Sequence, residues 1–138
     1  MPGEINTDAL ARKLHDTFPE VLFAFLFGSS GQGKVNPGSD IDIAVYFKEN
    51  IEKADLIPRI MELVETDLEG IECDITILNT AGPLIAFEAL RGKRLFVRDE
   101  AMDEYAGFYS LTCRLYEDQI WWMKKQLEYR GYEVQWDH

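Results

Sequence analysis

Two carboxylates separated by one residue, Asp40 and Asp42, are set into an apolar segment. Side chains on a strand alternate faces, so both carboxylates point the same way while Ile41 and Ile43 point the other way, into a core. Neighbouring carboxylates repel and raise each other's pKa, and a divalent cation removes that penalty. Magnesium characteristically binds one or two carboxylates together with substrate phosphates. The pair therefore indicates a magnesium site, the alternative being a hairpin with a solvated acidic edge.

A Gly-Ser turn supplies the second half of this chemistry. Gly28 and Ser29 end one apolar run, and ten residues separate them from Asp40. A glycine turn lets backbone N–H groups approach a phosphate, and a short helix starting there would add its positive end. The Gly-Ser turn between two apolar runs favours the magnesium and phosphate interpretation over the acidic edge.

This spacing resembles the signature of the DNA polymerase β-like nucleotidyltransferase superfamily. Gly28, Ser29, Asp40 and Asp42 match that signature residue for residue. The compact length and the run 39–45 are similar to the minimal nucleotidyltransferase branch, which includes antitoxins paired with HEPN-domain toxins. The resemblance extends over roughly residues 8–120.

The resemblance implies a third acidic residue on a neighbouring strand, where it completes the metal site and acts on the incoming hydroxyl. Asp74 lies within the apolar run 71–78, whose other acidic residue, Glu72, stands near its start. Asp74 has the required setting, and its alternative is a charge that protects an edge strand. The implied catalytic and metal-binding residues are Asp40, Asp42 and Asp74. The implied nucleotide-binding residues are Gly28, Ser29, Ser30, Lys34 and Ser39. Two Mg²⁺ ions and ATP as the substrate complete the implied site.

The chain departs from the family pattern in one respect. Many minimal members have an arginine soon after the Gly-Ser, whereas here the nearest cation is Lys34. A lysine is a point charge and not a planar fork of donors, so it would hold phosphate differently.

The elements that position these residues are predicted from periodicity and turn residues. Apolar runs predict strands, and apolar residues at three- and four-residue steps predict helices. We expect strands at 21–27, 40–47 and 72–78 with a possible edge strand at 94–97, and helices at about 6–17, 52–68, 81–90 and 100–130. The fold class is α+β: a small mixed sheet with helices mainly on one face, as in the nucleotidyltransferase fold, plus a long C-terminal helix. We expect a core at 1–98 and a helical extension at 99–138, packed as one domain.

The composition of the chain limits the classes of molecule that it is expected to bind. The net charge is −11 and the pI about 4.5, so the surface repels phosphate backbones, which argues against direct nucleic-acid binding. Cys73 and Cys113 lack the spacing of a metal site, and Cys73 is expected to be a buried thiol. With no apolar run of membrane-spanning length and no signal peptide, the expected location is the cytoplasm.

Two further groups have open interpretations. Trp121 and Trp122 are adjacent in the aromatic C-terminal helix, so one is expected to be exposed or covered by another chain, the alternative being simple core packing. The basic residues between Arg91 and Arg98 are either solvated surface or hold a triphosphate or an acidic neighbour. A lone histidine, His15, is expected at the surface.

The resemblance implies transfer of AMP from ATP to a hydroxyl, most simply that of a tyrosine, on a HEPN-family ribonuclease toxin that the chain silences as its antitoxin. Two alternatives remain open at this point. The chain is a non-catalytic antitoxin that occludes the toxin, or an adenylyltransferase that acts on small molecules such as aminoglycosides.

Overall fold

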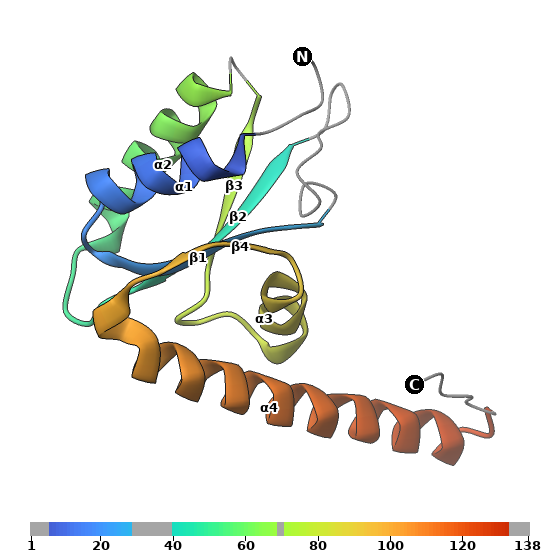
Figure 1. The fold of residues 1–138 in the computed structure, drawn as a ribbon. Helices are drawn as coiled ribbons and strands as arrows, with labels where there is room; N and C mark the ends of the chain where they lie inside the picture. The colour runs from blue at the N-terminus through green and yellow to red at the C-terminus, as the bar shows by residue number, and fades with distance from the viewer. Residues whose placement is uncertain (1–5, 29–39, 69–70, 133–138) are drawn as a thin grey trace.

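The computed structural model describes residues 6–28, 40–68 and 71–132. Within them the chain forms four strands and four α-helices (Figure 1). Their order is α1 (Thr7–Thr17), β1 (Val21–Phe27), β2 (Ile41–Phe47), α2 (Lys53–Asp67), β3 (Cys73–Ile77), α3 (Pro83–Leu90), β4 (Lys93–Val97), the 3₁₀ turn η2 (Asp99–Ala101) and α4 (Met102–Tyr129). The elements expected from periodicity are thus confirmed, with β4 at one edge of the sheet.

The sheet is mixed, and its order is β3-β2-β1-β4. β1 pairs antiparallel with β2 and with β4, while β2 and β3 are parallel because α2 crosses over between them. The register places Asp42 beside Phe27 on one side and beside Asp74 on the other. The ends of three elements therefore meet at Asp42.

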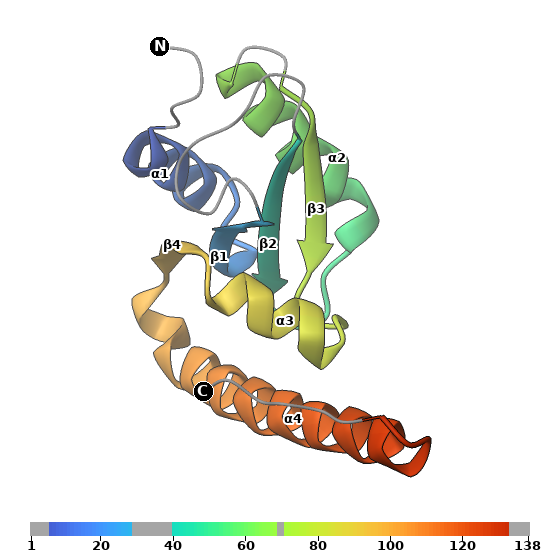
Figure 2. The ribbon, with the colours of Figure 1, turned by 90° about the vertical axis from the view of Figure 1, so that its right-hand side faces the viewer.

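Helices α1 and α2 cover the face of the sheet opposite Asp42 (Figure 2). The apolar stripe of α1, which ends in the buried Phe18, packs there, and the Asn6 side chain caps the helix by accepting from the Ala9 N–H at 3.1 Å. The core on this face takes the alternate residues of β2 and the inner side of α2: Ile41, Ile43, Val45, Phe47, Leu56, Ile60 and Val64.

Helix α3 and the first turns of α4 cover the other face, which is the face of Asp42. All seven residues of β1 are buried, so both faces of this central strand require cover. Phe23 stacks on Tyr46 with ring centroids 4.5 Å apart, and Tyr105 and Phe108 of α4 pack against Phe23. The expectation that helices lie mainly on one face therefore needs correction, because the aromatic residues of β1 and β2 recruit α3 and α4 to the second face.

Arg98 joins the first helix to the last strand. Only 8% of it is exposed, and its guanidinium donates to the carbonyl oxygens of Val21 at 2.6 Å, His15 at 2.6 Å and Phe18 at 2.8 Å. The His15 ring lies edge-on to Phe96 and has one nitrogen 3.2 Å from the same guanidinium. Arg98 therefore has a structural role inside the fold and is not part of the basic surface.

Helix α4 extends well beyond the sheet (Figure 1). Only Thr112 in it is buried. Trp121 is 61% exposed and Trp122 is 54% exposed, so both indoles lie outside the core of this chain. Among the described residues no helix has the length and the apolar character needed to cross a membrane.

Candidate active site

Asp42 and Asp74 lie side by side on neighbouring parallel strands. Asp40 directly precedes β2, and both it and Asp74 are exposed, whereas Asp42 is half-buried. Burial raises the pKa of Asp42 above its usual value, and the charges of Asp74, Asp40 and Glu88 raise it further. Four carboxylates therefore lie close enough to affect the pKa of Asp42 or to be that group itself. The three predicted aspartates lie together at the beginning of β2 and β3.

This donor set fits magnesium that arrives with a nucleotide. Over residues 6–28, 40–68 and 71–132, no three His, Cys, Asp or Glu side chains form a group that could hold a metal ion alone. Magnesium commonly takes only one or two carboxylates, with phosphate oxygens and waters as its other ligands. Asp42 and Asp74 can provide the two protein ligands, and the three-carboxylate cage with two ions stays a prediction.

Gly28 brings the end of β1 against the Asp42 carboxylate. Its φ is +67°, a left-handed conformation that favours glycine, and a Cβ at this position would lie 2.7 Å from Asp42 Oδ2. Glycine is thus required both by the turn and by the close approach. The predicted nucleotide-binding residues Ser29, Ser30, Lys34 and Ser39 lie outside the described residues, so their roles stay predictions.

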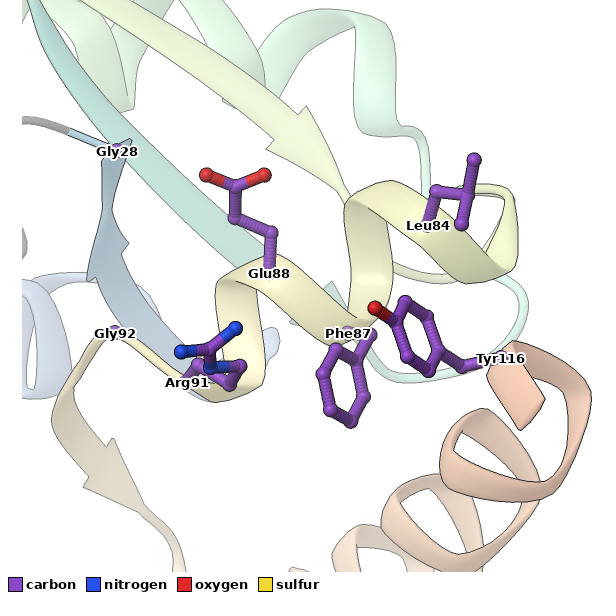
Figure 3. A pocket seen from close by; sticks show the side chains of 7 residues that line it. All are labelled: Gly28, Leu84, Phe87, Glu88, Arg91, Gly92 and Tyr116. Carbon is purple, nitrogen blue, oxygen red and sulfur yellow. The ribbon is translucent and has the colours of Figure 1, made fainter. Parts of the chain in front are cut away.

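A pocket of about 450 Å³ opens from Gly28 between β1, α3 and α4. Figure 3 shows a polar end, where Glu88 and Arg91 project from α3 near Gly28, and an apolar end formed by Leu84, Phe87 and Tyr116. The Phe87 and Tyr116 rings stack with centroids 3.8 Å apart. Its volume is in the range of pockets that take small ligands, and its polar end adjoins the carboxylates.

Helix α3 is held at fixed depth against the sheet. Its small residues Ala86 and Ala89 are buried against the sheet, and Pro83 starts the helix. At its other end, a Cβ on Gly92 would lie 2.1 Å from the Leu26 carbonyl oxygen, so only glycine allows the chain to turn so close to β1. This contact places the end of α3 beside the end of β1.

The sequence predicts no site role for Phe87, Glu88 and Tyr116, whereas Arg91 belongs to the basic stretch for which triphosphate binding is one open interpretation. One signal was available, because Glu88 is the only charged residue between positions 81 and 90. The aromatic pair gave no such signal, since Phe87 and Tyr116 read as ordinary apolar positions of two separate helices.

Cys73 directly precedes Asp74 in β3. Its thiol is buried, and burial, with help from Glu65, Asp74 and Asp42, raises its pKa to about 12. The thiol therefore stays protonated, which confirms the expected buried cysteine.

Comparison with known proteins identifies a family and a shared fold. The sequence model of the family described as "Polymerase beta, Nucleotidyltransferase" matches residues 10–101. The protein adenylyltransferase MntA of Shewanella oneidensis is 28% identical over 97 residues, which cover 67% of this chain and 66%, slightly under two thirds, of that protein.

Two solved structures share the fold. A chain of a toxin–antitoxin complex with AMP-PNP superposes with a TM-score of 0.67 at 22% identity, covering 90% of this chain and 94% of that one. A chain from the complex of a tri-AMPylated Shewanella oneidensis HEPN toxin with its MNT antitoxin gives a TM-score of 0.59 at 18% identity, covering 88% and 92%.

Proposed function

Because the chain belongs to the polymerase beta nucleotidyltransferase family, we propose that it transfers AMP from ATP to a tyrosine hydroxyl of a HEPN-family ribonuclease toxin and so acts as an antitoxin. The observation that carries the proposal is the pair Asp42 and Asp74, which lies next to the Gly28 turn at the mouth of a pocket of ligand size. The relative named a protein adenylyltransferase supports the choice of a protein as the acceptor.

In the proposed reaction the acceptor oxygen forms a bond to the α-phosphorus of ATP. The bond from that phosphorus to its bridging oxygen breaks, and pyrophosphate leaves. Asp42 and Asp74 would hold magnesium, which supplies a Lewis acid that neutralises the phosphate charge. Asp74 is exposed and can receive the proton of the acceptor hydroxyl, whereas Asp42 is half-buried and fixed against Gly28.

ATP as the nucleotide and two Mg²⁺ ions belong to this proposal. The similar solved complex with AMP-PNP supports an adenine nucleotide. The cytoplasm, the compartment expected from the sequence, is part of the same proposal because it supplies ATP.

The deciding experiment is the intact mass of a HEPN-domain partner encoded beside this chain and co-expressed with it. The partner should gain one or more increments of about 329 Da, the mass of an attached AMP group. Asp74→Ala should add none while still binding the partner, because Asp74 is an exposed residue of β3 and the substitution leaves α4 unchanged.

Occlusion without catalysis is the second candidate, and one observation favours it. Large apolar side chains are exposed along the outer part of α4: Leu111, Leu115, Trp121, Trp122, Met123 and Leu127. Such a surface on a single helix suits a partner of complementary shape. A partner that is inhibited by the wild type yet keeps its unmodified mass would establish occlusion and refute transfer.

A further inference from the structure

Arg91 is the one cation among the described residues that line the pocket. It lies at the end of α3, at the same end of the pocket as Gly28 (Figure 3). Its guanidinium lies 5.9 Å from the centroid of the Phe87 ring, and no ion pair joins it to a carboxylate within the described part of the chain. The donors of Arg91 are therefore available to a ligand.

A cation is needed at this site because its side chains and a bound nucleotide would both carry negative charge. Asp42 and Asp74 with Glu88 make the mouth of the pocket acidic, and a nucleoside triphosphate is strongly anionic. Magnesium held by Asp42 and Asp74 would offset the charge of these carboxylates, and a cationic side chain can offset the charge of the terminal phosphates.

The backbone fixes Arg91 at this place. Gly92 packs directly against the Leu26 carbonyl oxygen, and the Gly92 N–H donates to Ala89 at 3.0 Å. Residue 91 is thus held beside the end of β1, which is also where Gly28 begins its turn. A guanidinium presents a planar fork of donors that matches phosphate oxygens in a bidentate manner.

We propose that Arg91 binds the terminal phosphates of the nucleotide and then the leaving pyrophosphate. The inference rests on the proposed nucleotide site, although it does not depend on which acceptor receives AMP. Arg91 makes this contact from α3, a part of the sequence far from the Gly-Ser turn.

The test is calorimetric titration with AMP, ADP and ATP in the presence of Mg²⁺, with no partner present. Arg91→Gln should weaken ATP binding about 10- to 100-fold and leave AMP binding nearly unchanged, since AMP lacks the phosphates that the guanidinium holds. Arg91→Lys should restore part of the loss. Arg94→Gln is the matched control, because Arg94 is an exposed cation that lies over Tyr105, away from the pocket.

Three results would overturn the inference: equal weakening of AMP and ATP, equal weakening by Arg94→Gln, or no weakening by Arg91→Gln. The first would assign Arg91 to supporting Phe87, and the second would indicate a general effect of charge. The outcome is separate from that of the mass experiment. Loss of ATP binding in Arg91→Gln supports this inference even where the partner gains no mass, and a modified partner supports the proposed function even where Arg91→Gln binds ATP normally.

Discussion

Gly28→Ala should separate the cost of the turn from the cost of disturbing Asp42. At φ +67° an alanine is destabilised by about 1–2 kcal/mol. Its Cβ would also lie 2.7 Å from Asp42 Oδ2, which is too close for non-bonded atoms. The carboxylate can rotate away, at a cost of about 1 kcal/mol for an unfavourable rotamer. The sum is about 2–3 kcal/mol, or a fall in Tm of about 6–12 °C for a domain of this size.

The effect on catalysis should be much larger than the effect on stability. A rotated Asp42 no longer presents its oxygens beside Asp74, and a displacement of about 1 Å at a reacting centre can reduce the rate about 100-fold. We therefore expect a folded protein with transfer activity reduced by two orders of magnitude. Thermal and urea denaturation give the stability, and initial rates of partner modification give the activity.

Two control variants separate the backbone cost of Gly28→Ala from the cost of the contact with Asp42. Gly131→Ala replaces another glycine with positive φ, +91°, where a Cβ would meet nothing within 4 Å, so it should show no more than the backbone cost. In an Asp42→Ala background, the contact with Oδ2 is gone and Gly28→Ala should cost about 1 kcal/mol less than in the wild type. Equal costs of Gly28→Ala in the two backgrounds would refute the argument that the Asp42 carboxylate requires glycine here.

Three more predictions concern charge and burial. Asp42→Asn should raise the Tm of the metal-free protein at pH 7, because burial and then the neighbouring carboxylates raise the folded-state pKa of Asp42. The gain in Tm should disappear as the pH falls below 3.8, where the wild-type carboxyl group is protonated in both the folded and the unfolded state. A gain in Tm that persists at that pH would contradict this cause. A thiol reagent should modify the half-buried Cys113 in the native protein and reach Cys73 only after denaturation, which mass mapping will show. Arg98→Ala should destabilise the fold by about 3 kcal/mol or more, since three backbone carbonyls lose their donor; chemical denaturation measures this loss, and an equal loss in Arg94→Ala would show that only surface charge matters.

The elements and the carboxylates were predictable because each depends on local pattern. The alternation in β2 placed Asp42 on the face opposite Ile41 and Ile43, and the structure confirms this. A carboxylate set into an apolar run indicated Asp74, which the parallel register then places beside Asp42. Such signals are contained in a few neighbouring residues and do not depend on how the helices and strands pack together.

The pocket was not predictable, because its walls come from elements that are distant in sequence. Phe87 on α3 meets Tyr116 on α4 only after both helices have folded onto the second face of the sheet. Arg98 and Arg91 belong to one basic stretch of sequence, yet one is buried as a structural donor and the other lines the pocket. Burial of the first follows from three carbonyls at the end of α1 and the start of β1, which no local pattern shows.

The position of the tryptophans along α4 has an optical consequence. Two of the three indoles of the chain, Trp121 and Trp122, lie in α4, and the third, Trp136, lies outside the described residues. The aromatic residues of the described core are phenylalanines and tyrosines. Trp121 and Trp122 already face solvent, so their emission should lie at long wavelength in the native protein and change little when the sheet unfolds. A shift to shorter wavelength would instead report that something has covered the outer end of α4. The fluorescence of Trp121 and Trp122 is thus a reporter of docking, and unfolding of the sheet is better followed by the circular dichroism of the backbone.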